Sequence, residues 1–134
     1  MNVLFLPDFA DGNPYQTILS NSLLKYGVKV HIPTGFGRYD RRFSIVKGLK
    51  RFRQYDIIHL HWPHTFLLAD KVWKSIAKSF EFLISLSVLK ICGVKLVWTV
   101  HNITSHERRY DKLVFFVNRL LLLLYDYVIV HCRT

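Results

Sequence analysis

Cysteine and acidic side chains are scarce in this sequence, and both shortages narrow the class of protein. The 134 residues include two cysteines, Cys92 and Cys132, whose wide separation matches no metal-binding or redox motif. We therefore expect buried, structural thiols and a reducing compartment. Nine acidic residues stand against 19 Lys and Arg, a formal net charge of +10, so one face should attract phosphate, nucleic acid or acidic lipid.

The sequence also lacks several motifs that are typical of particular enzyme reactions. No serine elbow, Cys-His pair, Walker loop or pair of usefully spaced carboxylates occurs. The G-x-G-x-x-G dinucleotide fingerprint is absent as well. The sequence therefore gives no support to hydrolase chemistry.

Apolar runs long enough to cross a bilayer are lacking. Two apolar stretches, 76–97 and 113–130, are each interrupted by polar or charged side chains: Lys78, Glu81, Lys90 and Lys95 in the first, Asn118, Arg119 and Asp126 in the second. We expect the leucine run at 120–124 to belong to the core. The first seven residues lack the features of a signal peptide, so we expect a cytoplasmic protein whose chain begins with a strand.

What the sequence does contain is a regular alternation of strand-like and helix-like segments in a chain the size of one domain. Apolar, β-rich runs occur at 2–6, 28–32, 56–61, 94–101 and 127–131. Segments of helical character separate them, which predicts a parallel sheet with right-handed crossovers. Because most runs are apolar on both faces, we predict an α/β, three-layer Rossmann-like domain with a central, buried five-stranded sheet.

The first helix has recognisable start and stop signals. Asn13 can cap it, Pro14 suits the first helical position, and Gln16 completes a capping box. We expect the helix to end near Tyr26, with Gly27 as its C-terminal stop.

Two further helical segments follow. Thr104 can cap a helix over 105–125, with Glu107 reaching back to it. The segment 66–92 predicts one helix, or two if Asp70 restarts it, and Gly93 ends it.

Unusual polar residues gather where the predicted strands end. Since ligands bind at the carboxyl ends of parallel strands, this edge is the expected site. The residues there are Asp8, Asp11, Gly12 and Asn13 after the first strand, His61, Trp62, Pro63 and His64 after the third, His101, Asn102, Thr104, Ser105 and His106 after the fourth, and His131 and Arg133 after the fifth.

The turn around Gly12 and Asn13 leads into a helix N-terminus. Free N–H groups and the helix dipole favour an anion such as a phosphate there. An ordinary strand-to-helix turn capped by Asn13 explains the same residues, and a single glycine does not separate the two readings.

Three histidines mark the end of the third strand. His59 and His61 point to the same face, and His64 lies beyond Pro63. A zinc site is disfavoured because no acidic or thiolate ligand is adjacent, so we expect no metal. We expect one of these histidines to face a ligand and another to pack in the sheet.

His101 ends the fourth strand, where the sheet fixes its backbone. A neutral imidazole there can donate a hydrogen bond or accept a proton. The alternative is a histidine bonded to nearby backbone.

A basic cluster lies between the second and third predicted strands. With apolar residues at helical spacing, it predicts either an amphipathic helix on acidic lipid or a surface helix with a solvated basic face. Its cations are Arg38, Arg41, Arg42, Lys47, Lys50, Arg51 and Arg53.

The order of these segments resembles the N-terminal domain of GT-B glycosyltransferases, especially family 4 and the bacterial polysaccharide mannosyl- and glucosyltransferases. The resemblance covers essentially the whole chain, 1–134. It is carried by the turn Asp11-Gly12-Asn13-Pro14-Tyr15, the segment 19–30, Asp56-Ile57-Ile58-His59-Leu60-His61-Trp62 and Val97-Trp98-Thr99-Val100-His101-Asn102.

The resemblance implies roles for several residues. In such enzymes the N-terminal domain holds the acceptor and a C-terminal domain holds the nucleotide sugar. His101 would contact the transferred sugar and stabilise charge on the leaving diphosphate. Donor-side contacts would come from Gly12, Asn13 and Asn102, and acceptor-side contacts from His61, Trp62 and His64.

The sequence also departs from that family. One glycine stands where a pair is common in the first loop. We also expect residues 1–134 to lack the C-terminal donor domain of such enzymes, and therefore to be inactive alone.

Two functions follow as hypotheses. The first is the N-terminal half of a glycosyltransferase that moves a hexose from a nucleotide sugar, its co-substrate, to a lipid-linked or polysaccharide acceptor, with no other cofactor. The alternative is a non-catalytic subunit that recruits a partner to acidic membrane through the basic cluster, at the inner face of the plasma membrane. Nucleic acid is a weaker candidate because no recognition motif accompanies the charge.

Overall fold

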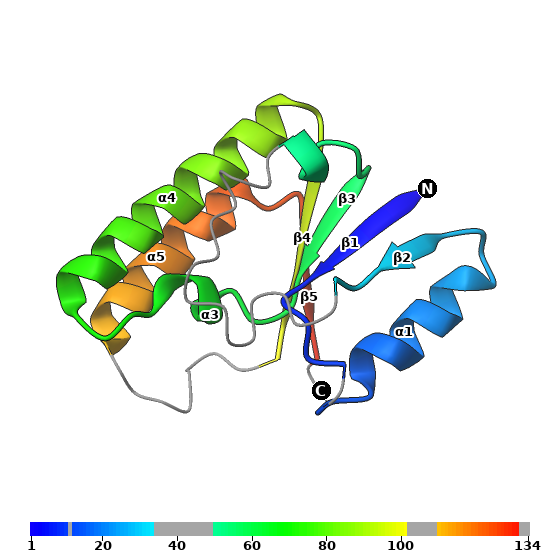
Figure 1. Ribbon diagram of the computed structural model, residues 1–134, viewed down its shortest axis with the longest axis horizontal. Coiled ribbons are helices and arrows are strands. Elements are labelled where there is room, and N and C mark those ends of the chain that lie inside the picture. The colour runs from blue at the N-terminus through cyan, green and yellow to red at the C-terminus, as the bar shows by residue number, and fades with distance from the viewer. Residues whose placement is uncertain (11, 34–49, 102–109, 132–134) are drawn as a thin grey trace.

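The five predicted strands form one parallel sheet (Figure 1). The computed structural model describes residues 1–10, 12–33, 50–101 and 110–131. Every neighbouring pair is parallel and the spatial order is β2-β1-β3-β4-β5. The strands are β1 (Asn2–Leu6), β2 (Lys29–His31), β3 (Ile57–Leu60), β4 (Lys95–Val100) and β5 (Tyr127–Val130). The prediction of an α/β, Rossmann-like domain is confirmed.

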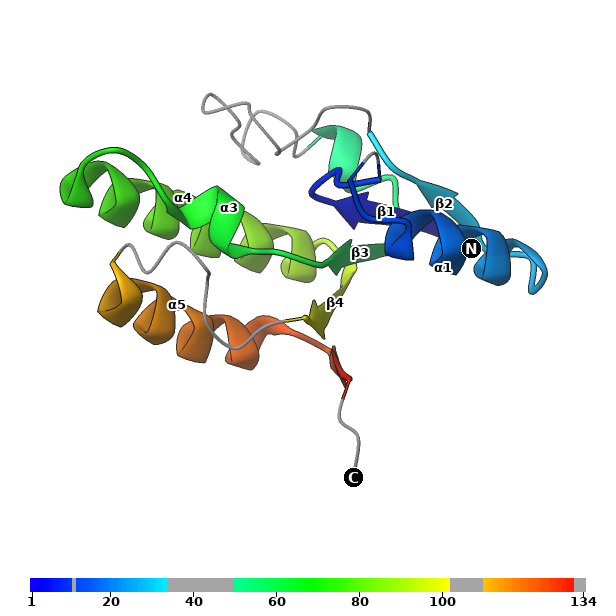
Figure 2. The same cartoon turned by 90° about the horizontal axis from the view of Figure 1, so that it is seen from below.

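Helices cover both faces of the sheet, which gives three layers. The helices are α1 (Tyr15–Leu24), α3 (His64–Leu67), α4 (Val72–Ile91) and α5 (Asp111–Leu124). Figures 1 and 2 show α1 on one face and α4 and α5 side by side on the other. This follows from right-handed crossovers, because the chain moves outward in one direction from β1 to β2 and in the other from β3 to β5.

The core has two parts because side chains alternate along each strand. The larger part lies under α4 and α5 and includes Leu4, Leu60 and Leu86. The smaller part places Val3 and Phe5 against the α1 side of the sheet. The central strands are therefore buried on both faces, as predicted.

The edge strand β5 does not fit that prediction. Tyr127 is 68% exposed and Val130 is 57% exposed. Both belong to an apolar run that was expected to be buried. β5 has one described neighbouring strand, and α1 lies near the opposite edge of the sheet. The expectation that every strand is covered on both faces is wrong for β5.

Two glycines end helices as the sequence predicts. Gly27 has φ 73°, and the Val28 N–H donates to the Leu23 carbonyl (3.2 Å). Gly93 has φ 88°, with a bond of the same kind from Val94. Both are left-handed helix stops, a conformation that costs glycine little.

The beginnings of the later helices differ from prediction. The segment 66–92 contains two helices, which is one of the two predicted arrangements, but the N-cap of α4 is Lys71 rather than Asp70. α5 begins at Asp111, and Tyr110 before it has φ 58°, which no right-handed helix adopts. A helix running unbroken over 105–125 is therefore wrong at Tyr110, while Thr104 and Glu107 lie outside the described residues.

Exposure corrects two further expectations. Cys92 is exposed rather than buried, and Cys132 lies outside the described residues. Within the leucine run, Leu121 is buried but Leu122 and Leu123 are exposed, so the run is only partly core. No helix in the described part of the chain is long and apolar enough to cross a membrane.

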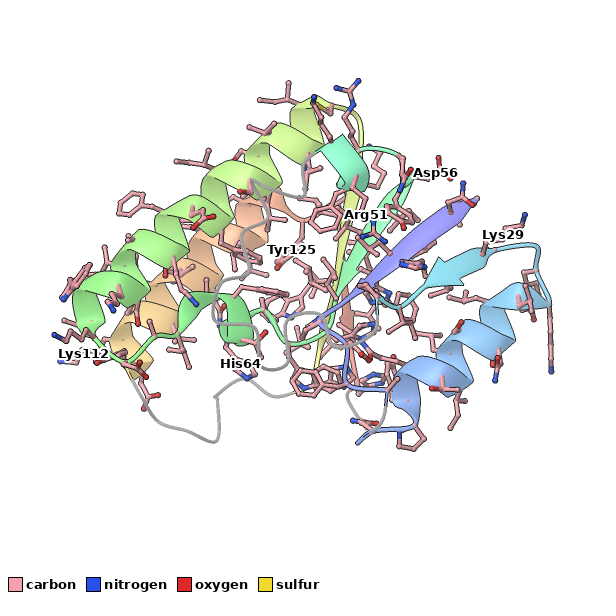
Figure 3. All side chains as sticks on the ribbon, viewed as in Figure 1. Lys29, Arg51, Asp56, His64, Lys112 and Tyr125 are labelled. Carbon is pink, nitrogen blue, oxygen red and sulfur yellow. The ribbon has the colours of Figure 1, made fainter. Side chains whose placement is uncertain are left out.

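Little of the basic cluster falls within the described residues. Arg38, Arg41, Arg42 and Lys47 lie outside them. Lys50 and Arg51 are exposed, whereas Phe52 between two arginines is buried in the larger core. Figure 3 shows Arg51 toward the same end of the sheet as Asp56, where the strands begin.

Candidate functional site

Four histidines meet on the α1 face of the sheet, near the carboxyl ends of β3, β4 and β5. We call His59, His61, His101 and His131 the histidine cluster. Strand register explains the meeting, because Leu60 pairs with Trp98 and Val100 pairs with Val130. One step further along, His61 is level with Thr99 and His101 is level with His131, all on the other face of the sheet. His101 lies two residues beyond Thr99 on that same face, within reach of the His61 side chain.

The central contact joins two imidazoles. His61 Nδ1 lies 3.3 Å from His101 Nε2, so one ring donates and the other accepts. The His61 backbone is held by its N–H, which donates to the Leu6 carbonyl (2.8 Å). Deeper in the sheet, His59 Nε2 lies 2.7 Å from the Thr99 hydroxyl oxygen. One histidine packed inside and one nearer the edge matches the arrangement expected from sequence.

Aromatic rings enclose His101 from two sides. Trp62 stacks on it with a centroid distance of 4.4 Å and an interplanar angle of 14°. Tyr15, from the first turn of α1, meets His101 edge-on at 4.8 Å and His131 at 5.5 Å. The rings thereby fix the orientation of the His101 imidazole before any ligand binds.

The loop after β1 runs beside this group of rings. Phe9 meets Trp62 edge-on at 4.8 Å. The Phe9 carbonyl accepts the N–H groups of Gly12 and Asn13, and the Asn13 side-chain oxygen accepts the Tyr15 N–H (3.0 Å). Asn13 therefore bonds to the first helical residue, Tyr15, from the position before the N-cap. The N-cap is Pro14, so the prediction of Asn13 as N-cap and Pro14 as first helical residue is one residue too early.

Gln16 does something other than close a capping box. Its side chain is fully buried, and its Nε2 donates to the Pro7 carbonyl (2.8 Å). Its Oε1 accepts the Phe9 N–H (3.0 Å). The predicted bond back to Asn13 is wrong, because Gln16 instead ties α1 to the loop after β1.

Three members of the cluster, His59, His61 and His101, are held in the neutral state. Burial, together with the charge of His101, lowers the pKa of His59 from 6.5 to about 4. Burial and then the neighbouring His59 and His101 hold the pKa of His61 far below its ordinary value. Burial and then His131 lower the pKa of His101. At neutral pH these three rings therefore offer one donor and one acceptor each rather than positive charge.

One buried nitrogen of the histidine cluster has no partner among the described residues. His61 Nε2 finds no hydrogen bond among the described residues, although the residue is 1% exposed. Buried polar atoms are nearly always paired, so this nitrogen marks an incompletely satisfied network.

Rings and neutral hydrogen-bonding groups suit an uncharged polar ligand. Such sites combine apolar walls with a few fixed polar atoms. A sugar has hydroxyl groups that both donate and accept, and carbon-bound hydrogens that can lie against a ring. The arrangement could bind a sugar without a charge on either partner.

The structure brings together only some of the predicted site residues. His61, Trp62 and His101 are in contact. Asn13 is linked to them indirectly, because it accepts the N–H of Tyr15, whose ring contacts His101. His64 instead begins α3, which packs against α4 through the stack of Phe66 on Phe82 (Figure 3). Asn102 lies outside the described residues.

Four residues that build the site have no ligand role predicted from sequence: Tyr15, Gln16, Thr99 and His131. The available signal for His131 and Thr99 was strand register, since each faces the same side of the sheet as His101. Nothing local marked Tyr15 or Gln16. In the described segments no three His, Cys, Asp or Glu side chains are placed to hold a metal ion.

Comparison with known proteins finds a distant, partial similarity. Two relatives, each called a GDP-mannose:glycolipid 4-beta-D-mannosyltransferase, come from Xanthomonas campestris pv. campestris and from a defined strain of that bacterium. Each is 32% identical over 100 residues, or 75% of this chain and 25% of the relative. The chain thus spans about a quarter of the length of these curated relatives. No family model matches the sequence.

Proposed function

We propose that this chain is the acceptor-side domain, over 1–134, of a GT-B type glycosyltransferase. It would transfer a hexose from a nucleotide sugar to a glycolipid or glycan. The observation that carries the proposal is the neutral His101 imidazole, stacked on Trp62 at the carboxyl edge of a parallel sheet. The similarity to a mannosyltransferase supports the reaction class and makes GDP-mannose the first donor to test.

In this proposal His101 contacts the transferred sugar. Its Nε2 is engaged with His61, which leaves Nδ1 to donate to or accept from a sugar hydroxyl. When His61 donates, His101 Nδ1 carries a proton and can donate toward the leaving group. When His61 accepts, His101 Nδ1 can take the proton of an acceptor hydroxyl.

The other residues take complementary parts. Trp62 and His61 line the acceptor side, and the turn at Gly12 and Asn13 lies beside the donor, together with Asn102. The donor nucleotide itself binds to a separate domain, on the same or a partner polypeptide. We place the protein in the cytoplasm, peripheral to the plasma membrane, where a lipid-linked acceptor would be reached.

Replacement of His101 tests the proposal. The chain is combined with a polypeptide that supplies the donor domain, and transfer of mannose from GDP-mannose to glycolipid is measured. His101→Ala should lower the rate by about 10²-fold or more, since it removes a positioned proton-transfer and hydrogen-bonding group. His31→Ala is the matched control, because His31 lies on β2 outside the cluster.

A second readout needs only the chain itself. Trp62 fluorescence should change when the acceptor oligosaccharide is added to the parent protein. Full transfer activity in His101→Ala would remove His101 from the mechanism. Absence of both transfer and acceptor binding in the parent would reject the function.

A further inference from the structure

A row of large apolar side chains runs along the outer side of α4. Trp73, Ile76, Phe80, Ile84 and Ile91 follow one another at spacings of three, four, four and seven, which places them on one side of a helix. Phe80 is 63% exposed and Ile91 is 85% exposed. The opposite side of α4 holds the residues buried against the sheet, so the exposed row is a second apolar side with no described partner.

The neighbouring helix α5 continues the same surface. Phe115, Phe116, Leu122 and Leu123 are exposed, whereas the buried Val114, Val117 and Leu121 face the core. α4 and α5 lie side by side on one face of the sheet (Figures 1 and 2). Lys90 on α4 also donates to the Leu124 carbonyl (2.5 Å). We call the exposed apolar residues of both helices the outer face.

The apolar side chains of the outer face are contiguous, unlike the isolated apolar side chains found on most protein surfaces. Single exposed apolar residues are normal on any protein. Here two adjacent helices each present a full apolar side in addition to the side that packs on the sheet. Contiguous apolar surface of that kind marks an interaction site.

Cations lie among these apolar side chains. Lys74 Nζ is 5.4 Å from the Trp73 ring centroid, and the Arg119 guanidinium is 6.0 Å from that of Phe115. Lys112 points outward at the beginning of α5 (Figure 3). Within α4 and α5, Asp111 is the one exposed acidic residue. The outer face is therefore both apolar and positively charged.

We propose that the outer face docks on a bilayer containing anionic lipid. The apolar side chains would lie at the boundary of headgroups and acyl chains, and the lysines and arginine would reach lipid phosphates. No described helix spans a membrane, so the two helices would lie in the plane of the interface. A second copy on this face is disfavoured, because a two-fold contact would bring Lys74, Lys112 and Arg119 toward their own copies.

This surface differs from the basic cluster at 38–53, and the proposal does not rest on sugar transfer. The test is flotation of the full chain with vesicles of phosphatidylcholine, with and without about one third phosphatidylglycerol. The parent should float with the anionic vesicles and retain part of its binding in high salt, because apolar insertion is not screened. Phe80→Ser with Phe115→Ser should lower the partition coefficient about tenfold or more.

The matched control is Ile18→Ser with Leu24→Ser, which removes two equally exposed apolar side chains from α1. It should float like the parent. Circular dichroism verifies that each variant is folded. Lipid brominated on its acyl chains should quench fluorescence in the parent, and less in Trp73→Phe.

Three results would overturn the proposal. One is equal flotation of the Phe80 and Phe115 variant and the parent. Another is complete loss of binding in high salt, which would assign binding to cations alone. The third is a concentration-dependent dimer that disappears in the variant, which would assign the outer face to a second copy.

Discussion

At the scale of single residues, His59, His61 and His101 are bases that the fold keeps unprotonated. His59 and His61 are buried in the sheet with little access to water. Positive charge on a neighbouring histidine would further disfavour protonation of each. Protonation therefore costs more in the folded chain than in the unfolded chain. The site gains uncharged hydrogen-bonding groups, and the protein becomes sensitive to acid.

His59 gives this sensitivity a measurable form. Its pKa is near 6.5 when unfolded and about 4 when folded. Between pH 6.5 and pH 4 His59 is protonated in the unfolded chain but neutral in the folded chain. The contribution of His59 to folding stability is therefore fully present above pH 6.5 and is lost as the pH falls toward 4. The free energy of unfolding should drop by up to ~1.4 kcal/mol per pH unit for this group.

Urea unfolding measured across that pH range checks the expectation. His59→Gln, which can still hydrogen-bond Thr99, should flatten the pH dependence, with the remaining slope due to His61 and His101. His31→Ala should follow the parent. Parallel curves for the parent and His59→Gln would show that His59 is not the acid-sensitive group.

Residue patterns alone located some of the site but could not assemble it. His61, Trp62 and His101 were found because each directly follows or ends a strand. Gln16 was misread because its partner, the Pro7 carbonyl, belongs to another element, while the capping box is a local rule. Tyr15 joined the cluster only once α1 was placed on the face that carries His101.

At the scale of elements, sequence rules for strand runs and helix ends predicted the structure best where the backbone of one residue decides where a helix stops. β1 spans the predicted 2–6, and Gly27 and Gly93 stop helices with left-handed backbone. The exposure of β5 could not be predicted, because apolar residues do not reveal whether a helix covers them. The positive φ of Tyr110 could not be predicted either, because tyrosine rarely adopts that conformation.

Asp126 links three elements at the end of the sheet where the strands begin. Its carboxylate accepts the Leu96 N–H (2.9 Å) and lies 3.5 Å from both Lys90 and Lys95. Burial raises the pKa of Asp126, but the Leu96 bond and the two lysines outweigh it, so the net pKa is lowered. The carboxylate thereby fastens the turn between α5 and β5 to β4.

Asp126→Ala should lower the free energy of unfolding by about 2 kcal/mol near neutral pH, because the Leu96 N–H loses a charged acceptor. A lowered pKa stabilises the folded chain above the unfolded value and ceases to do so as the pH falls through the folded value. The gap between variant and parent should therefore shrink in strong acid. Lys95→Ala, which removes an exposed 3.5 Å partner, should cost about 0.5 kcal/mol or less; an equal cost would place the stabilisation in the ion pair.

At the scale of the whole molecule, the two proposals combine. The outer face would lie on the membrane, and the histidine cluster, on the other face of the sheet, would contact the acceptor. α4 and α5 run antiparallel to the strands, so their first turns lie toward the carboxyl ends of the strands (Figure 1). His101 directly follows the carboxyl end of β4. Trp73 and Lys112 belong to those first turns. A bilayer against the outer face would hold lipid-linked sugars near the edge that carries the cluster.

This arrangement predicts that membrane docking matters for one kind of acceptor only. In the assay with a donor domain, Phe80→Ser with Phe115→Ser should slow transfer to the lipid-linked acceptor in vesicles, through a higher KM with little change in kcat. Transfer to the same oligosaccharide free in solution should be unaffected, because the outer face does not touch it. His101→Ala should slow transfer to both acceptors through kcat. Equal losses with both acceptors in the outer-face variant would mean that Phe80 and Phe115 support the fold or the site, and not the approach to a membrane.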